Sequence, residues 1–138
     1  MIIMKFNPLL FGLLLVLSGC AQQLPSEMPA LKSFLKESNK PAVIKFYADW
    51  CKTCKSYAPT FEKVAEDLSN TVDFFSVDVD DKASKALVKE FKIAQIPVTL
   101  IASQDRLKVL KQYGPLSYNK LTSKIDEVAN QKGETVSN

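Results

Sequence analysis

Apolar residues along the chain follow two spacings, which alternate from one segment to the next. Apolar residues three or four positions apart predict helices, and short continuous apolar runs predict buried strands. The predicted helices cover residues 30–38, 51–69, 82–91 and 117–129. The predicted strands cover residues 42–48, 72–79, 98–102 and 107–112. Strands that alternate with helices and end in a hairpin predict an α/β protein with a central mixed β-sheet flanked by helices.

Three further sequence features refine the predicted elements. Pro59 lies inside the helix predicted for residues 51–69, and we expect it to kink that helix. Ser117 comes just before the last predicted helix, where its hydroxyl can cap the free backbone N–H groups. The polar residues 131–138 predict a flexible tail.

The N-terminal segment has the layout of an export signal. Lys5 precedes an apolar run over residues 9–17, and small residues follow that run. A secretory signal peptide has this pattern. The run is too short for a transmembrane helix, which needs roughly 20 apolar residues. We therefore predict a signal peptide over residues 1–19.

Residues 17–20, "LSGC", resemble the lipobox of bacterial lipoproteins. The resemblance implies that the Cys20 thiol receives a diacylglycerol and becomes the N-terminus after cleavage, and that several acyl chains anchor the protein stably. Residues 20–29 contain two prolines and predict a tether between the lipid and a domain over residues 30–130. The alternative is an ordinary signal peptide, in which Cys20 has no such role.

The charge of the chain is nearly balanced and excludes one class of partner. It has 18 basic and 15 acidic side chains and no histidine. The lysines are scattered, without a basic stripe or an aromatic RNA-binding motif, so we expect no nucleic-acid partner. The chain has three cysteines. If Cys20 carries lipid, one pair remains, in a compartment where disulfides form.

That pair, Cys51 and Cys54, lies in the stretch "DWCKTC" and has three possible roles. A zinc site normally needs four ligands, whereas this chain offers two thiols and no histidine, so we predict no metal. A structural disulfide across so small a loop would constrain little of the unfolded chain. A redox couple needs an attacking thiolate and a second thiol close enough to resolve the mixed disulfide, and this spacing provides both.

The position of the pair at a helix start assigns a role to each thiol. The unpaired N–H groups and the dipole of the helix lower the pKa of a cysteine at its N-terminus. Lys52 and Lys55 add positive potential nearby. We therefore predict that Cys51 is the exposed nucleophile and Cys54 the resolving thiol.

The stretches "FYADWCKTC", "QIPVT" and "YGPLS", together with Pro59 and the order of the elements, closely resemble the thioredoxin family over residues 30–130. The resemblance implies a thioredoxin fold and a thiol:disulfide oxidoreductase that works without a bound cofactor on the cysteines of other proteins. The first strand of that family is missing or irregular here. "FYADWC" also resembles thioredoxin-like domains of envelope and thylakoid proteins that pass electrons toward secreted or membrane targets.

The resemblance also implies neighbours for the cysteine pair. It gives Pro97 a cis peptide bond facing the disulfide, and Ile96 a backbone that pairs with the substrate chain. Trp50 would shield the thiolate and offer a flat docking surface, and the alternative is that it fills the core. Lys52 and Thr53 separate the two cysteines and complete the predicted site.

Two further positions have open interpretations. Tyr113 and Gly114 belong to the neighbouring loop, or they are only a strand end and a turn. Lys45 stands six residues before Cys51, where thioredoxins usually carry a buried aspartate that helps move the proton of the resolving thiol. Lys45 either extends to water along the strand or acts as an electrostatic partner of the dithiol.

Together these features predict a lipid-anchored thiol:disulfide oxidoreductase of the bacterial cell envelope, facing the periplasm or the exterior. Its partners would be cysteine-containing envelope proteins and a membrane electron donor. We expect a reductase or an isomerase-type electron carrier rather than a dedicated oxidase. The alternative is a lipid-anchored binding or chaperone module of the same fold, whose activity would survive the loss of both cysteines.

Overall fold

The computed structural model describes residues 29–130. Its strands are β1 (Ala42–Tyr47), β2 (Asp73–Asp78), β3 (Val98–Ala102) and β4 (Val109–Tyr113). Its α-helices are α1 (Pro29–Phe34), α2 (Lys52–Leu68), α3 (Lys85–Glu90) and α4 (Tyr118–Ala129), with a 3-10 turn, η1 (Lys82–Ser84), before α3. Every element lies where the apolar pattern predicts one, and the differences are confined to the ends of elements.

The strands form one mixed sheet in the order β2-β1-β3-β4. β1 pairs with β2 in parallel and with β3 antiparallel, and β3 and β4 are antiparallel neighbours. All residues of β1 from Ala42 to Phe46 are buried. A central strand covered on both faces accounts for the continuous apolar run in the sequence.

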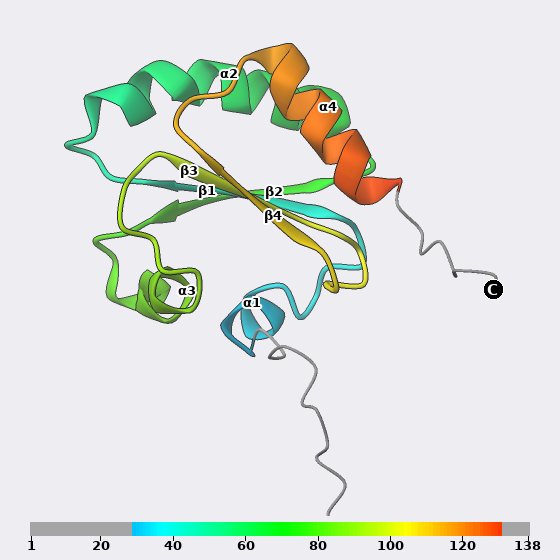
Figure 1. The fold of residues 1–138 in the computed structure, drawn as a ribbon, viewed down its shortest axis with the longest axis horizontal. Helices are drawn as coiled ribbons and strands as arrows, with labels where there is room; N and C mark the ends of the chain where they lie inside the picture. The colour runs from blue at the N-terminus through cyan, green and yellow to red at the C-terminus, as the bar shows by residue number, and fades with distance from the viewer. Residues whose placement is uncertain (1–28, 131–138) are drawn as a thin grey trace, which may run out of the picture.

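Helices cover both faces of the sheet, as predicted. Figure 1 shows α2 and α4 on one face and α1 with α3 on the other. Because side chains alternate along β1, Val43 packs with Phe61 under α2 and α4. Its neighbour Ile44 packs with Leu31 and Leu87 under α1 and α3. The two hydrophobic clusters fix the position of α2, the helix that carries the cysteine pair.

Local hydrogen bonds decide where the helices begin and end. α2 begins after Cys51 and continues through Pro59 to Leu68. Ser117 caps α4 as predicted, because its side chain accepts the backbone N–H of Lys120 at 3.4 Å. The helix predicted for residues 30–38 already ends at Phe34. The Ser38 hydroxyl donates to Asp73 and accepts the backbone N–H of Lys40 at 3.4 Å, a group that a longer helix would bond to a backbone carbonyl.

Two charged side chains join segments that are distant in sequence. The Glu90 carboxylate accepts the backbone N–H groups of Ala30 at 2.8 Å and Leu31 at 3.0 Å, which closes the N-terminus of α1. The buried guanidinium of Arg106 donates to three backbone carbonyls in the turn and the loop that it joins. These acceptors are the carbonyl oxygens of Ser38, Lys40 and Ser103.

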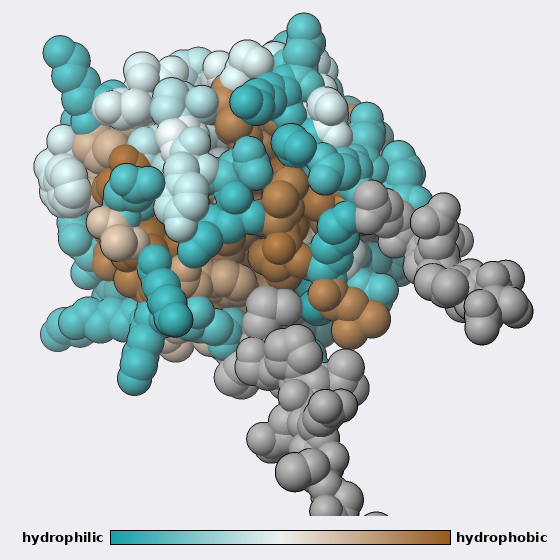
Figure 2. All heavy atoms as spheres, in the orientation of Figure 1, coloured by the Kyte–Doolittle hydropathy of each residue, from teal (hydrophilic) through white to brown (hydrophobic). Residues whose placement is uncertain are grey.

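The edge strand β4 is less covered than the rest of the sheet. Its residues Val109 and Leu110 are half-buried, and Leu107 in the preceding turn is 85% exposed. Figure 2 shows hydrophobic atoms along this strand and long hydrophilic side chains around α3. The core therefore ends at β4, on the side opposite to β2.

Several predicted features lie outside the described residues. They are the signal peptide (1–19), the lipidated Cys20, most of the tether (20–29) and the tail (131–138). Within residues 29–130, no helix combines the length and the apolar character that a membrane span requires.

Candidate active site

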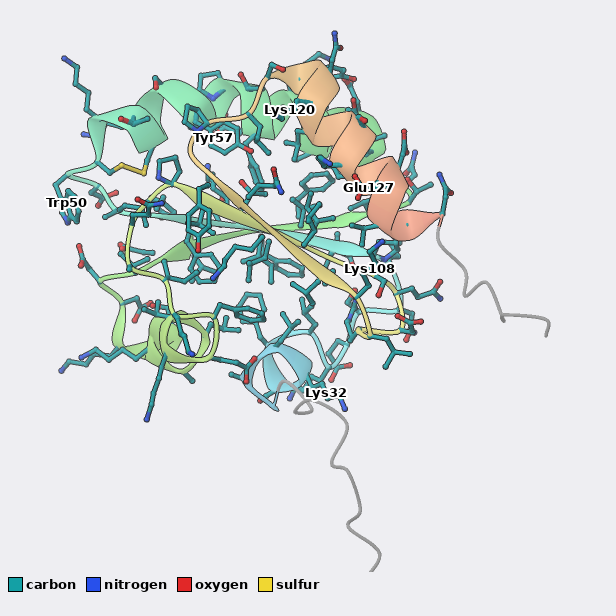
Figure 3. The ribbon with its side chains drawn as sticks, viewed as in Figure 1. Lys32, Trp50, Tyr57, Lys108, Lys120 and Glu127 are labelled. Carbon is teal, nitrogen blue, oxygen red and sulfur yellow. A yellow bond between two sulfur atoms is a disulfide. The ribbon has the colours of Figure 1, made fainter. Side chains whose placement is uncertain are left out.

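Cys51 and Cys54 form a disulfide at the start of α2, with their Cα atoms 5.2 Å apart. β1 leads directly into this point, through Ala48, Asp49 and Trp50. Figure 3 shows the disulfide at the exposed end of α2, with Trp50 beside it. The strand and the helix that hold the pair are both anchored in the core, so its position is fixed by the fold.

The disulfide is largely shielded from solvent, so Cys51 is not the exposed residue that the sequence predicts. The exposed fraction is 7% for Cys51 and 3% for Cys54, and both pack with Ala48. Cys51 is the N-cap of α2, and its Sγ atom accepts the backbone N–H of Cys54 at 3.2 Å. Once the disulfide is reduced, this N–H group and the helix dipole favour a thiolate at Cys51. Lys52 and Lys55 are exposed on the first turn of α2.

A groove of about 480 Å³ opens beside Cys51. Its walls come from the start of α2, the end of β2 and the loop between α3 and β3. The lining residues are Trp50, Cys51, Lys52, Thr53, Val79, Ile93, Ala94, Gln95 and Ile96. The groove therefore brings together five of the residues that the sequence predicts for the site.

The remaining predicted residues of this face lie on the adjacent loops. The Ile96–Pro97 peptide bond is cis, and Ile96 packs against the cysteine cluster. The carbonyl of Pro97 accepts the backbone N–H of Gly114 at 2.9 Å, which joins the two loops. Gly114 has φ +75°, a conformation that favours glycine, and Tyr113 is half exposed.

Trp50 is a surface residue and not core filler, since 72% of it is exposed. Its Nε1–H donates to Asp80 Oδ2 at 2.8 Å, which orients the ring at the edge of the groove. The sequence prediction missed Asp80. The signal was its position just after β2, because the carboxyl ends of parallel neighbours such as β1 and β2 meet at one edge of the sheet.

Lys45 is buried and does not extend along the surface to water. Its exposed fraction is 5%, and its Nζ lies 4.6 Å from the centre of the Phe61 ring and 5.5 Å from that of Tyr47. Burial lowers the pKa of the Lys45 ammonium, and the charge of Glu62 opposes that shift. An uncompensated charge is costly in such a place, so Lys45 needs a nearby anion.

No metal site is evident within residues 29–130, where no three cysteine, aspartate or glutamate side chains gather as ligands. The reactive group that the structure shows at this site is the disulfide. A shielded disulfide at a helix N-terminus, next to an open groove, can exchange with an external thiol or disulfide. These features define a dithiol–disulfide exchange site.

Comparisons with known proteins identify the family. The thioredoxin family profile matches residues 24–127, and the chain therefore belongs to the thioredoxin family. It is 39% identical to a thioredoxin of Mycoplasmoides gallisepticum over 87 residues, which is 63% of this chain and 83% of that protein. It is 43% identical to a thioredoxin of Borreliella burgdorferi over 49 residues, or 36% of this chain and 42% of that protein.

A solved structure agrees with the fold. The crystal structure of chloroplastic thioredoxin z superimposes with a TM-score of 0.62 at 23% identity, covering 72% of this chain and 87% of that one. The chain thus has a thioredoxin fold, with a mixed four-stranded sheet flanked by helices. By class it is a thioredoxin-family thiol:disulfide oxidoreductase with a redox cysteine pair.

Proposed function

We propose that the protein exchanges disulfides with protein substrates of the bacterial cell envelope, through Cys51 and Cys54. The observation that carries the proposal is the Cys51–Cys54 disulfide at the N-terminus of α2, where Cys51 lines a groove large enough for a peptide segment. Cys51 attacks the substrate disulfide, and Cys54 resolves the resulting mixed disulfide. Both electrons of the dithiol then reside on the substrate.

The groove suggests how a substrate chain binds. Trp50 offers an exposed flat ring on one side, and Ile96 provides backbone next to Cys51 on the other. An extended chain with an apolar residue beside its cysteine fits between them. In this arrangement Lys52 and Thr53 contact the substrate near the reacting sulfur atoms.

We further propose that the enzyme acts as a reductase or an isomerase-type electron carrier. The proposal is supported by the likeness of "FYADWC" to domains that pass electrons toward secreted or membrane targets. Outside the cytosol no cytosolic reductase reaches the disulfide, so regeneration requires a membrane electron donor.

The proposed location depends on the N-terminal sequence. The export-signal pattern of residues 1–19 and the lipobox-like "LSGC" support a lipid anchor at Cys20. An anchored enzyme meets its donor and its substrates at the membrane surface. The oxidising compartment outside the cytosol supplies proteins with disulfides on which it can act.

Thiol alkylation in intact bacteria tests direction and location together. Cys51 and Cys54 are expected mainly as free thiols, becoming disulfide-bonded when the membrane donor is deleted. The wild-type protein is expected in the membrane fraction, and the Cys20→Ser variant outside it. A pair that stays oxidised in every strain contradicts the reductase proposal, and a wild-type protein with an unmodified Cys20 contradicts the anchor. Full activity of a variant lacking both cysteines would favour the binding module instead.

A further inference from the structure

The two cysteines face different cavities. Cys51 lines the substrate groove, whereas Cys54 lines a second cavity of about 310 Å³ between α2, β1 and β2. The titratable groups around this cavity are Lys45, Tyr47, Asp49, Cys54, Lys55 and Glu62. β2 contributes Ser76, which does not titrate. The reaction described above leaves this cavity without a role.

Two of the charged groups of the second cavity, Lys45 and Glu62, act on each other electrostatically. Lys45 reaches it from β1, with its Nζ over the Phe61 ring, and Glu62 reaches it from α2. The opposite charge of Glu62 acts on Lys45. Phe61, whose ring lies under the Lys45 ammonium, and Glu62 are adjacent in α2. This arrangement keeps a buried cation next to an anion that is itself exposed to solvent.

Disulfide exchange requires a proton acceptor at this place. Cys54 must lose its proton before it attacks the mixed disulfide, because the thiolate is the nucleophile. Since the substrate occupies the groove beside Cys51 at that moment, the proton leaves through the second cavity. Its volume has room for a chain of water molecules across the two helical turns between Cys54 and Glu62.

We infer that Glu62 accepts the proton of Cys54 during resolution of the mixed disulfide, and that Lys45 positions Glu62 and stabilises the Cys54 thiolate. The inference rests on the proposed exchange reaction and adds a residue to it. Glu62 accepts the proton through the cavity and not by direct contact with the sulfur atom. Lys45 is the positioning residue.

The step balances in atoms and in charge. The Cys54 S–H bond breaks, and its proton passes along the water chain to a Glu62 carboxylate oxygen. The Cys54 thiolate forms the bond to Cys51 Sγ, and the bond between Cys51 and the substrate sulfur breaks, with both electrons leaving on the substrate thiolate. The proton transfer moves one negative charge from Glu62 to Cys54, so the net charge of the cavity does not change. Such a transfer avoids the cost of creating a new net charge next to the buried Lys45.

The other titratable groups of the cavity are poorer candidates for the acceptor of the Cys54 proton. Lys55 ends in an ammonium group and Tyr47 in a phenol, and neither offers the basic oxygen of a carboxylate. Asp49 lies in the loop beyond β1, and it is not among the charges that act on Lys45. Glu62 is the carboxylate of this cavity that combines solvent access with an electrostatic link to Lys45.

Stopped-flow reduction of 5,5′-dithiobis(2-nitrobenzoate) by the reduced full chain separates the two steps. Attack by Cys51 releases the first thiolate of the probe, and resolution by Cys54 releases the second. For Glu62→Gln we expect the second phase to slow by about ten-fold or more, while the first stays within about two-fold. The pH at which the second phase reaches half its maximal rate is expected to rise. Glu62→Asp should recover part of the rate.

Glu66→Gln is the matched control, because Glu66 lies on the same helix, one turn further on, and does not line the cavity. It should leave both phases unchanged. An equal second phase in wild type and Glu62→Gln across the pH range would overturn the inference, provided that both proteins show the same thermal unfolding midpoint. A wild-type protein without a second phase would instead contradict the proposed exchange by Cys54. The first result would contradict only the role of Glu62, and the second would contradict the exchange reaction, so the experiment distinguishes them.

Discussion

The backbone N–H of Cys54 donates a hydrogen bond of 3.2 Å to the Sγ atom of Cys51, the residue to which its own side chain is bonded. The bond makes Cys51 the cap of α2 and aims the free N–H groups of the first turn at its sulfur. Cys54 lies within the helix, one turn further in. The two sulfur atoms are therefore chemically unequal once reduced.

Covalent trapping should separate the two cysteines. The Cys54→Ser variant lacks the resolving thiol and is expected to accumulate mixed disulfides through Cys51, because nothing displaces the bound substrate. The Cys51→Ser variant should trap little, since Cys54 is 3% exposed and does not line the groove. Non-reducing electrophoresis of envelope extracts measures the mixed disulfides that each variant forms. Equal trapping by the two variants would contradict the assignment of nucleophile and resolving thiol.

Reversing the charge of Lys45 should change the redox potential. Its ammonium favours thiolates in the cavity that Cys54 lines, and thiolates favour the reduced form. Lys45→Asp is therefore expected to raise the apparent pKa of Cys51 and to make the reduction potential more negative. A shift of about 30 mV corresponds to about 1.4 kcal/mol for this two-electron couple and is measurable in glutathione buffers.

The exposed Lys120 of α4 provides the control for that charge reversal. Figure 3 labels Lys120 on α4, whereas the cysteine pair lies at the start of α2. Solvent and salt screen a charge at such a site, so Lys120→Asp should leave the potential nearly unchanged. If Lys45→Asp behaves in the same way, Lys45 has no electrostatic influence on the dithiol.

Removing the Arg106 side chain should destabilise the fold. Arg106→Ala deletes the hydrogen bonds to the carbonyls of Ser38, Lys40 and Ser103 and leaves these acceptors partly buried. We expect a loss of about 2–4 kcal/mol in the free energy of unfolding. Urea denaturation measures it, and an unchanged midpoint would show that these bonds contribute nothing.

The exposed Lys92 should show the opposite effect. Its φ of 49° lies in the left-handed region, at the end of α3, where glycine is the favoured residue. Lys92→Gly is expected to stabilise the protein by up to about 1 kcal/mol, because the strain of the side chain disappears. Lys92→Ala keeps the strain and serves as the control in the same denaturation experiment. Equal stability of the two variants would contradict the strain argument.

Acid should weaken the turn between β3 and β4. The Ser103 hydroxyl at 2.6 Å and the backbone N–H of Leu107 at 3.0 Å lower the pKa of the Asp105 carboxyl. The folded pKa is thus below the unfolded value of about 3.9. The carboxylate contributes stability that is present above that value and is lost as the pH falls through the folded pKa.

The Asp105→Asn variant tests this pH dependence. It should be less stable than wild type at neutral pH, and the difference should shrink as the pH falls below about 4. Thermal unfolding midpoints between neutral and acidic pH measure it. A stability difference that does not change with pH would show that the charge of Asp105 makes no contribution.

The sequence by itself determined the elements and the reactive pair. Apolar spacing located all four strands of the described sheet, because each strand must bury its side chains within one short run. The Cys-x-x-Cys spacing placed both thiols at a helix start, and the caps at Cys51 and Ser117 depend only on neighbouring residues. These features are local, so the chain itself encodes them.

Only the tertiary structure decided which distant residues meet. Asp80 orients Trp50 across 30 positions because β1 and β2 lie in parallel. Lys45 could have extended to water, but the packing of α2 against the sheet buries it over Phe61 and near Glu62. No local pattern predicts these contacts, since each depends on how a helix settles on a sheet after the strands have paired. The sequence thus determined which residues can react, whereas the packing decided which groups surround them and where a proton can go.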